Sequence, residues 1–511
     1  MPFTLINPLW LALSSLLVWA LALIVRSKLR ARKYRLPPRV PGIPLIGNTL
    51  QFPADLSDQI VWAKKLADQY GEMFTVQLGA ADWVFLNSSR VVSDIMEKKA
   101  AITSSKPEMP MAQGVMSADR RLLFMPYGDR WRELRKIMHG ILNSRRMIDF
   151  SAYQDTESKQ MLFEYLKSPD LWYKANQRYT MAVVVSFVFG RRPMLNDPNA
   201  DALFQQAEDV IMAMQPGKNL VDGFPILAKL PSFLHWWRRK GEHYLAESIR
   251  VYDYEVNHIK ALMDAGKAPP CFAVDFLQAT ANSHFDELQK TFVMGTLLEA
   301  GSDTTRVAIS QMLAGAVLYP DWVERAREHL DRVCGSLEKG EQLRLPVWED
   351  RNELTYITAA VKEGFRWRPM IPLGVPHVLS ADLDYEGYKF PAGTTVTWNN
   401  FYIGLNPEEH EQPERYWPER FMNEDVGNVL KGHWAFGPGR RVCVGYNMAE
   451  TNAWMALSRL LYCFNFEANP DKPIDSFRTE WLEFKKAPFD MKITPRSPAH
   501  VKLIEEAYAS I

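Results

Sequence analysis

Hydrophobic and polar residues follow a helical period over most of this 511-residue chain. Apolar residues that recur every three or four positions predict helices. Such segments lie at residues 200–215, 240–264, 286–319, 320–335, 354–368 and 445–464. Alternation with a period of two, which is typical of strands, is confined to short segments near 73–86 and 383–398. The pattern therefore predicts a mainly α fold with a small β portion.

The longest apolar run lies near the amino terminus. Residues 9–25 have the sequence LWLALSSLLVWALALIV, and a helix that begins one turn earlier would reach about 30 Å, the thickness of a bilayer core. Basic residues follow this run but do not precede it: Arg26, Lys28, Arg30, Arg32, Lys33 and Arg35. This asymmetry predicts an anchor at 8–25, residues 1–7 in the lumen and the main body in the cytoplasm. The alternative is a cleaved signal peptide, which would need basic residues before the run.

The segment after the apolar run is basic and rich in proline. Residues 26–48 end in LPPRVPGIPLIGN, which predicts a stiff, extended linker. From residue 49 to residue 511 the chain has no low-complexity tract, internal repeat or second linker. We therefore expect one continuous globular domain at 49–511.

Composition narrows the class of protein. With 47% hydrophobic residues the chain can bury a large core, and its 60 basic residues equal its 60 acidic ones, so a nucleic-acid partner is not expected. The chain has four widely spaced cysteines: Cys271, Cys334, Cys443 and Cys463. They form no CxxC pair, which argues against a disulfide scaffold or a zinc site and indicates a reducing compartment. Without a GxGxxG or GK[ST] loop there is no fused nicotinamide or flavin domain, so electrons for redox chemistry must come from another protein.

One cysteine stands in a distinctive loop. Residues 436–445, with the sequence FGPGRRVCVG, are rich in turn formers and lead directly into the predicted helix at 445–464. Cys443 therefore lies just ahead of a helix amino terminus, where unpaired backbone N–H groups and the positive end of the helix dipole favour a thiolate. A thiolate is the form of cysteine that binds iron.

A small polar patch, AGSDTT at 300–305, interrupts the apolar helix predicted at 286–319. Gly301 alone costs about 1 kcal/mol relative to Ala inside a helix, so a compensating role is expected. Ala300 and Gly301 precede Thr304 by four and three residues, and on one helix face they would leave a recess for a diatomic ligand. Asp303 and Thr304 are adjacent and lie about 100° apart around the helix, so their side chains cannot point at the same atom. This arrangement suits a proton relay better than a pair of residues acting on one atom. The alternatives are a bond from Thr304 to its own helix carbonyls and an ordinary ion pair for Asp303.

Charged and aromatic residues recur at helical spacing elsewhere. Glu363 and Arg366 are three residues apart, and Arg420 lies in the segment PERF at 418–421. Trp131 and Arg135, in WRELR, are four residues apart and can reach toward one site. Each of these pairs is weak on its own, because many helices carry such pairs for packing alone.

Together these motifs resemble those of the cytochrome P-450 family. The cysteine loop matches F-x-x-G-x-R-x-C-x-G, the polar patch matches [AG]-G-x-[DE]-T-[TS], and the charged pair with its downstream Arg resembles the family's ExxR and PERF elements. The segment around Trp131 resembles the family's WxxxR helix. The resemblance spans essentially the whole chain, and its general pattern is most similar to microsomal fungal enzymes of secondary metabolism.

The resemblance implies a role for each matching residue. Cys443 would be the axial ligand of haem b, with Phe436 packed against it, Gly439 in the turn and Gly445 beside the porphyrin. The residues expected to contact the haem propionates are Arg441, Trp131, Arg135 and His377. Ala300 and Gly301 would border the oxygen site, Thr304 would bond to dioxygen and Asp303 would relay protons. Three residues would form a structural network: Glu363, Arg366 and Arg420.

The implied activity is that of a monooxygenase on a bulky apolar molecule. Electrons would come from NADPH through a cytochrome P-450 reductase, with cytochrome b5 as a further donor, and the site would be in the endoplasmic reticulum membrane. The resemblance places substrate at segments 108–126, 205–220, 296–305 and 370–376, which are rich in methionine. Oxidative coupling or desaturation on the same scaffold, a reductase-independent haem-thiolate isomerase, and a haem sensor or carrier remain alternatives.

Overall fold

A computed structural model describes residues 14, 18, 33–44, 46–143, 151–193, 197–215, 217–477 and 485–511. The expected anchor at 8–25 lies outside the described residues except for Ser14 and Val18, and so do residues 26–32 of the expected linker. Among the helices that are described, none is both long enough and apolar enough to cross a bilayer.

Helices make up most of the described chain. The α-helices are α2 (Leu56–Tyr70), α3 (Ser89–Val92), α4 (Ala100–Thr103), α5 (Asp129–Ile141), α7 (Ser151–Lys167), α8 (Trp172–Phe189), α9 (Pro198–Met214), α10 (Leu220–Gly223), α11 (Arg238–Asp264), α12 (Phe272–Ala279), α13 (Glu287–Leu318), α14 (Pro320–Cys334), α15 (Thr355–Trp367), α16 (Asn400–Gly404), α17 (Tyr446–Cys463) and α18 (Pro498–Ala509). Short π or 3₁₀ helices lie between them: η1 (Ser93–Glu97), η2 (Pro110–Val115), η3 (Pro169–Leu171), η4 (Pro225–Lys229), η5 (Ser232–Leu234), η6 (Trp348–Asn352), η7 (Pro418–Phe421) and η8 (Gly439–Arg441).

The strands are short and form small sheets: β1 (Met73–Leu78), β2 (Ala81–Leu86), β3 (His377–Val378), β4 (Leu383–Tyr385), β5 (Tyr388–Phe390), β6 (Thr395–Trp398), β7 (Phe464–Ala468) and β8 (Met491–Pro495). A four-stranded sheet has the order β1-β2-β6-β3, in which β2 and β6 are parallel. β4 with β5 and β7 with β8 form antiparallel pairs. The β4–β5 turn has positive φ at Glu386 and Gly387, which matches the twist of a tight hairpin.

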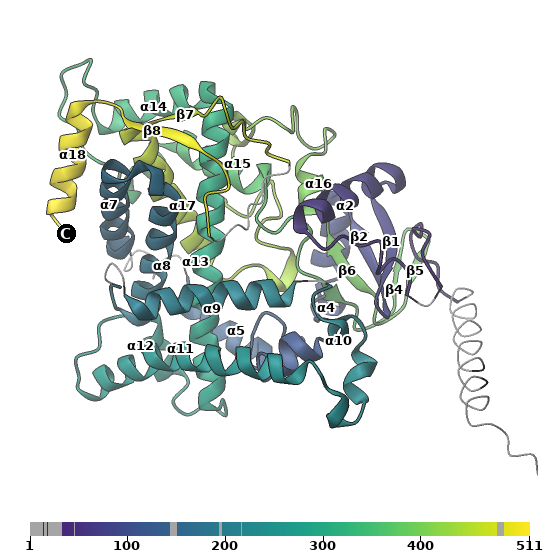
Figure 1. Ribbon diagram of the computed structural model, residues 1–511. Coiled ribbons are helices and arrows are strands. Elements are labelled where there is room, and N and C mark those ends of the chain that lie inside the picture. The colour runs from purple at the N-terminus through teal and green to yellow at the C-terminus, as the bar shows by residue number, and fades with distance from the viewer. Residues whose placement is uncertain are drawn as a thin grey trace, which may run out of the picture.

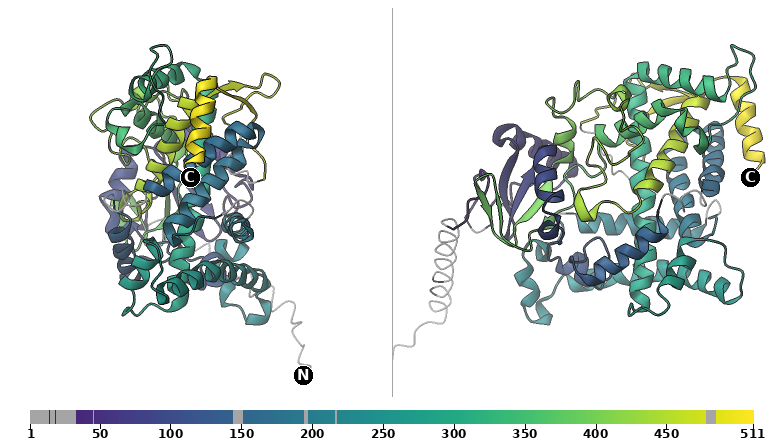
Figure 2. Two further views of the ribbon diagram at one scale, coloured as in Figure 1. Left: turned by 90° about the vertical axis from the view of Figure 1, so that its left-hand side faces the viewer. Right: turned by 180° about the vertical axis from the view of Figure 1, so that it is seen from behind.

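The β-rich part gathers at one end of the molecule and the long helices fill the rest (Figures 1 and 2). The first sheet, the β4–β5 hairpin and α2 form the β-rich end, whereas α13 runs through the middle of the helical part (Figure 1). At about 1.5 Å per residue, the 32 residues of α13 span about 48 Å. Its start is capped by Asp286, whose side chain accepts a hydrogen bond of 2.7 Å from the Gln289 N–H.

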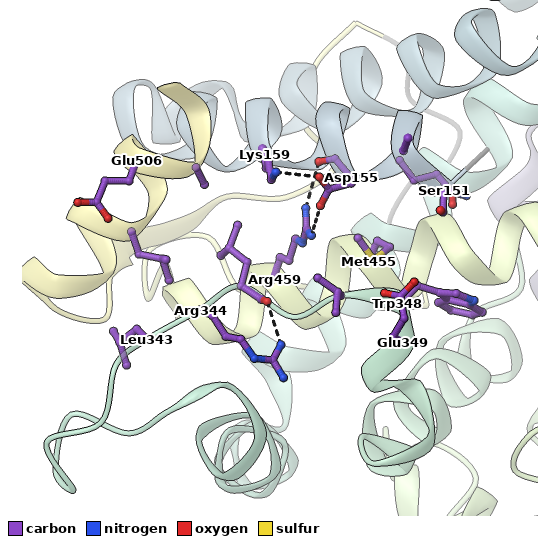
Figure 3. A pocket seen from close by; sticks show the side chains of 16 residues that line it. Ser151, Asp155, Lys159, Leu343, Arg344, Trp348, Glu349, Met455, Arg459 and Glu506 are labelled. Carbon is purple, nitrogen blue, oxygen red and sulfur yellow. Dashed lines mark hydrogen bonds and ion pairs between the residues drawn. The ribbon is translucent and has the colours of Figure 1, made fainter. Parts of the chain in front are cut away.

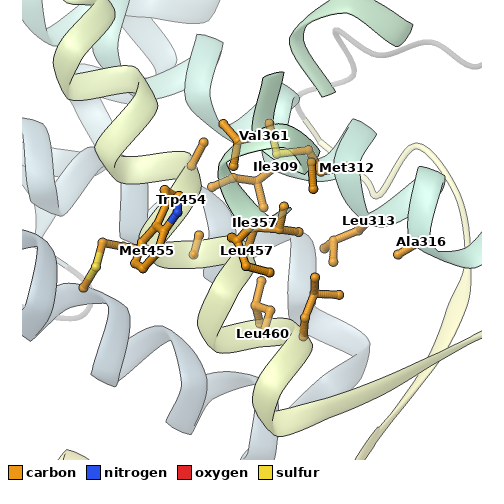
Figure 4. Close-up of a cluster of buried hydrophobic side chains, with 14 of the residues drawn as sticks. Ile309, Met312, Leu313, Ala316, Ile357, Val361, Trp454, Met455, Leu457 and Leu460 are labelled. Carbon is orange, nitrogen blue, oxygen red and sulfur yellow. The ribbon is translucent and has the colours of Figure 1, made fainter. Parts of the chain in front are cut away.

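The largest core cluster surrounds the second half of α13. Ile309, Met312 and Leu313 meet side chains of α15 and α17, among them Ile357 and Leu457 (Figure 4). Residues 305–317 of α13 are all buried, so this half of the helix has no polar face. The core fixes α17, and with it the segment that immediately precedes α17, against α13.

The structure confirms the predicted mainly helical fold with small sheets. The six helices predicted from periodicity correspond to α9, α11, α13, α14, α15 and α17. The predicted β segments contain the β1–β2 and β4–β5 pairs together with β6. Periodicity did not predict α7 and α8, which together contribute much of the packing against α13 and α17.

Candidate active site

The loop that carries Cys443 is a compact turn ahead of α17. The Cys443 N–H donates a hydrogen bond of 2.8 Å to the Phe436 carbonyl, and η8 lies within the loop. Gly439 has φ +65°, and a Cβ placed there would collide with the Met96 carbonyl of η1. Glycine at this position therefore meets two demands, a left-handed backbone and close contact with a neighbouring segment.

The Cys443 thiol faces space inside the protein. The side chain is exposed, yet the surrounding protein raises the pKa of the thiol by burial, which indicates the wall of an internal space and not the outer surface. A Cβ built on Gly445 would meet only the Cys443 Sγ, at 4.0 Å, so the space beside the sulfur is open. The Gly445 N–H and Arg135 oppose the effect of burial and lower the pKa, the direction expected at a helix amino terminus, but burial outweighs them.

Phe436 lies beside this loop in an aromatic group. Its ring centroid is 5.0 Å from that of Phe365 on α15 and 6.4 Å from that of Tyr446 at the start of α17. The ring thus joins the cysteine loop to both helices. Its expected effect on the thiolate remains a prediction.

Several basic side chains lie partly or fully buried near the same loop. Arg441 donates hydrogen bonds to the carbonyls of Ser104 and Met125, at 2.8 and 2.7 Å, and its guanidinium lies 4.1 Å from the centre of the Trp131 ring. Burial, aided by Arg135, lowers the pKa of Arg441 to about 9, so the side chain is still charged at pH 7. Arg135 donates to the Val442 carbonyl, and burial lowers its pKa as well.

His377 and Lys106 complete this group. The Lys106 Nζ donates to the carbonyls of Val375 and Pro376, at 3.3 and 3.0 Å, and His377 Nδ1 lies 2.7 Å from the Thr103 carbonyl. Burial holds the pKa of Lys106 and of His377 well below the ordinary values, and neighbouring positive charge adds to the effect. Sequence reasoning missed Lys106, because a lysine in SSKP resembles an ordinary surface residue until the fold buries it.

We name Lys106, Arg135, His377 and Arg441 the cation group. Within the described part of the chain, no Asp or Glu forms an ion pair with any of them. The lowered pKa of His377 leaves its imidazole neutral at pH 7, but the arginines keep positive charge that has no acidic partner there. Such charge is costly to hold away from water, so the group suits a bound anion. Haem b fits this donor set, because it combines two carboxylates with an iron that a cysteine thiolate can ligate.

The middle of α13 exposes one stripe of an otherwise buried helix. Its partly or fully exposed positions are Thr296, Leu297, Ala300, Gly301 and Thr304. They are three and four residues apart and share one side of the helix, which we name the accessible stripe. Apart from Leu297 the stripe consists of small or polar residues, and their exposure in the middle of a buried helix suits a place where a ligand could bind.

Thr304 and Gly301 make local contacts within and beside α13. The Thr304 hydroxyl donates a hydrogen bond of 2.7 Å to the Ala300 carbonyl, the local bond that we noted as an alternative. A Cβ on Gly301 would lie 2.7 Å from Val184 Cγ2 of α8. The absent side chain at Gly301 therefore lets α8 approach α13, which differs from the recess that we expected it to form with Ala300. The bond from Thr304 to dioxygen remains a prediction.

Asp303 lies apart from the accessible stripe. Its carboxylate is fully buried, 3.0 Å from Arg306, whose guanidinium lies 4.7 Å from the centre of the Tyr173 ring on α8. Burial raises the pKa of Asp303 to about 6, while Arg306 opposes the rise and Glu208 adds to it. The ion-pair alternative is thus present, and a proton relay through Asp303 remains a prediction.

Glu363, Arg366 and Arg420 come together as one buried network. Arg366 binds both carboxylate oxygens of Glu363 at 2.7 Å, and Arg420 Nε lies 3.3 Å from Glu363 Oε2. Arg366 also donates to the carbonyls of Gly404 and Pro413. The network ties α15 to the segment that leads into the cysteine loop, and it offers no open surface for chemistry.

A cavity of about 590 Å³ lies between α7, α17, α18 and residues 343–349 (Figure 3). None of its lining residues was a predicted site residue. Asp155 lies between Lys159 and Arg459, at 2.8 and 2.5 Å, so these charges are satisfied within the protein. The cavity is separate from the cation group.

The cysteine loop, the basic side chains without an acidic partner in the described chain, and the accessible stripe of α13 are compatible with a bound haem, and Cys443 as its ligand remains a prediction. The family model for cytochrome P-450 matches residues 37–493, and the chain belongs to the cytochrome P-450 family, a family of monooxygenases. It is an oxidoreductase of that family.

Relatives and solved structures agree with this assignment. The chain is 30% identical over 504 residues to cytochrome P-450 monooxygenase virE of Hypocrea virens, covering 95% of this chain and 90% of the relative. It is 32% identical over 497 residues to cytochrome P-450 monooxygenase verL of Clonostachys rogersoniana, covering 93% and 90%. A solved zebrafish cytochrome P-450 with abiraterone shares the fold, with a TM-score of 0.69 at 19% identity, over 86% of this chain and 100% of that one.

Lys106→Met should weaken the retention of haem. Removing one charged donor for a carboxylate should speed haem loss about tenfold, measured by transfer of haem to apomyoglobin. Lys99→Met, on an exposed lysine of the same segment, is the control and should leave the rate unchanged. An unchanged rate for Lys106→Met would show that this lysine is not part of the haem contacts.

Asp303 should make the fold less stable as pH rises. Because its folded pKa of about 6 exceeds the ordinary value of 3.8, the folded state holds the proton more tightly, and ionisation costs stability. Between pH 5 and pH 7 the wild type should lose about 1 kcal/mol of unfolding free energy relative to Asp303→Asn. Urea unfolding at both pH values measures this difference, and parallel pH profiles for the two proteins would contradict it.

Proposed function

We propose that this protein is a haem-thiolate monooxygenase that oxidises a bulky apolar molecule in secondary metabolism, with electrons from NADPH delivered by a reductase. The observation that carries the proposal is the Cys443 thiol, open to internal space beside the cation group. The two relatives, each a monooxygenase of a fungus, support the expected class of reaction. Oxidative coupling and desaturation use the same residues and are alternatives on the same site.

Different residues of the chain would bind the haem, leave room beside it and handle protons. Cys443 would supply the axial thiolate, and a coordinating metal deprotonates a thiol even where burial raises its pKa. Bound haem would supply the activation of dioxygen. The cation group would hold the haem carboxylates, and Ala300 would leave room on the accessible stripe. Thr304, whose hydroxyl bonds to the Ala300 carbonyl, would present its oxygen to the same space.

The proposal of an apolar substrate rests on two segments that would cover the site, residues 110–116 and α9. Met111 and Met116 of the segment 110–116 pack with Val210 and Ala213 of α9 in one buried cluster. Flexible thioether side chains adapt to bulky apolar shapes. The cluster joins two of the segments that the family resemblance assigns to substrate.

A reductase partner fits the charge around the cysteine loop. The exposed basic residues in this region are Lys98, Lys99, Arg132, Lys136 and Arg440. Lys98 and Lys99 directly follow η1, Arg132 and Lys136 lie on α5, and Arg440 lies in the cysteine loop. These segments contact one another through Gly439 and Arg135. Asp94 pairs with Lys98 and Asp129 pairs with Arg132, so an acidic electron-transfer protein would dock by charge complementarity chiefly at Lys99, Lys136 and Arg440, and cytochrome b5 would use the same charge.

Replacing Cys443 tests the central proposal. The reduced wild-type protein with carbon monoxide should show the strongly red-shifted absorption band of thiolate ligation, and Cys443→Ala should lack it. Cys463→Ala, on a cysteine buried in the core, is the control and should keep the band. A band typical of histidine ligation in the wild type would exclude the thiolate. A product formed without NADPH and reductase would favour the isomerase alternative.

We further propose that the protein is anchored in the endoplasmic reticulum membrane by residues 8–25, with the catalytic domain in the cytoplasm. Residues 220–236, which we name the apolar loop, carry four strongly exposed side chains: Leu220 (55%), Ile226 (63%), Phe233 (83%) and Trp236 (61%). Exposed basic residues lie within or beside it: Lys218, Lys229, Arg238, Arg239 and Lys240. Apolar residues bordered by cations suit an anionic lipid surface.

Vesicle binding tests the apolar loop. A chain that begins at Lys33 should bind vesicles of phosphatidylcholine and phosphatidylserine, and Phe233→Ser with Trp236→Ser should weaken this binding at least about tenfold, since both aromatic side chains lose apolar burial. Leu337→Ser, on an exposed apolar residue outside the loop, is the control. Equal flotation of the double variant and the control would rule out lipid contact by the apolar loop.

A further inference from the structure

Glu299 of α13 is the centre of a buried polar network. Its Oε2 accepts a hydrogen bond from Arg121 Nη1, and its Oε1 accepts one from Gln206 Nε2 at 3.0 Å. The Tyr252 hydroxyl also donates to Oε1. One carboxylate thus binds three side chains from three other segments of the chain.

The network extends to two serines. Gln206 Nε2 also donates to Ser248 Oγ at 2.7 Å, and Arg121 Nε donates to Ser117 Oγ at 3.1 Å. We name the whole set the polar roof: Ser117, Arg121, Gln206, Ser248, Tyr252 and Glu299. It joins the loop at 117–121, α9 and α11 to α13, and α9 crosses α13 in Figure 1.

Two polar atoms of the roof lack a partner. Arg121 Nη2 and Gln206 Oε1 form no hydrogen bond within the described part of the chain, although Arg121 is 1% exposed and Gln206 is 5% exposed. The two side chains are bound to opposite oxygens of the Glu299 carboxylate. A donor and an acceptor are therefore held on either side of one carboxylate, both buried and both unsatisfied, and a buried polar group of this kind calls for a partner.

The roof lies beside the accessible stripe of α13. Thr296 and Ala300, which belong to the stripe, precede and follow Glu299 by three residues and one. The Thr296 hydroxyl oxygen is a third buried polar atom without a partner in the described chain. Polar atoms without a partner in the described chain therefore occur both in the polar roof and on the neighbouring turn of the stripe.

The charges within the polar roof favour a neutral group on any bound molecule. The guanidinium of Arg121 and the carboxylate of Glu299 cancel, so neither a second anion nor a second cation gains from binding there. A hydroxyl group can accept a hydrogen bond from Arg121 Nη2 and donate one to Gln206 Oε1. A carbonyl can only accept, and a hydrocarbon can do neither.

We propose that Arg121 and Gln206, positioned by Glu299, form a specificity subsite for a neutral hydroxyl group of the substrate. The inference rests on the proposed function and narrows it: the substrate is a mainly apolar molecule that carries a hydroxyl at the end remote from the oxidised carbon. Glu299 acts through Arg121 and Gln206 and is a positioning residue.

Binding of three probes of one shape tests the subsite. Decalin, decalone and decalol differ only in an oxygen substituent, and their dissociation constants for the haem-loaded, full-length protein can be measured by equilibrium dialysis. The wild type should bind decalol about tenfold more tightly than decalin, although decalol is the more water-soluble, with decalone between them. In Arg121→Met with Glu299→Leu, which replaces a buried ion pair by apolar residues of similar size, decalin should bind most tightly.

A variant of Gln206 and a control double variant complete the test. Gln206→Met should remove the advantage of decalol over decalone, because only the alcohol donates to Gln206 Oε1. The control is Arg120→Gln with Asp286→Asn, which removes the exposed neighbouring ion pair and should keep the wild-type order of affinities. Equal affinities in the wild type, or an unchanged order in both roof variants, would overturn the inference and leave the network a purely structural tie.

The carbon monoxide spectrum of each preparation separates this result from the proposed function. A thiolate-type band together with no preference for decalol would reject the subsite alone. Absence of that band from the wild type would reject the proposed function, whatever the order of the probe affinities.

Discussion

Lys106 and His377 lie buried, and Arg135 and Arg441 partly buried, around the cysteine loop without an acidic partner in the described chain, and this shortage of negative charge governs the design of the site. A protein interior disfavours such a cluster, and burial lowers the pKa of Lys106 and of Arg441 accordingly. Backbone carbonyls satisfy hydrogen bonds of these residues but cannot neutralise their charge. The fold is therefore arranged to be completed by an anion, and binding of that anion would contribute to the stability of the whole protein.

The helical part holds this site rigidly. α13 packs on α15 and α17 through a continuous apolar core (Figure 4), and Glu363 with Arg366 ties α15 to the backbone near Gly404 and Pro413. Because α17 begins immediately after the cysteine loop, the sulfur is positioned by the same core that positions the accessible stripe. The cover made by α9 and the loop at 117–121 is joined to α13 differently, through polar contacts around Glu299. The base of the site is thus held by apolar packing and the cover by hydrogen bonds.

Much of this arrangement could be predicted from the sequence, and the exceptions have physical causes. Amphipathic helices and the paired strands were predicted because one face of each is apolar. α8 was not predicted, because it is buried on nearly every side and has no polar face to create a period. At the site, the Cys443 loop and the Glu363 network were predicted from local motifs. Lys106 was missed, since its burial depends on contacts with residues about 270 positions away.

Because of the close contact at Gly301, the residues allowed at position 301 of α13 and at position 184 of α8 depend on each other. A Cβ at residue 301 would lie 2.7 Å from Val184, so any larger residue there requires a smaller one on α8 or a displaced helix. Among proteins that share this packing, the two positions should vary together, with loss of glycine on α13 accompanied by alanine or glycine in place of valine on α8. The short motif around Thr304 thus restricts which residues are allowed on a helix more than a hundred residues earlier in the chain. A substitution in one helix limits the substitutions that the other can accept.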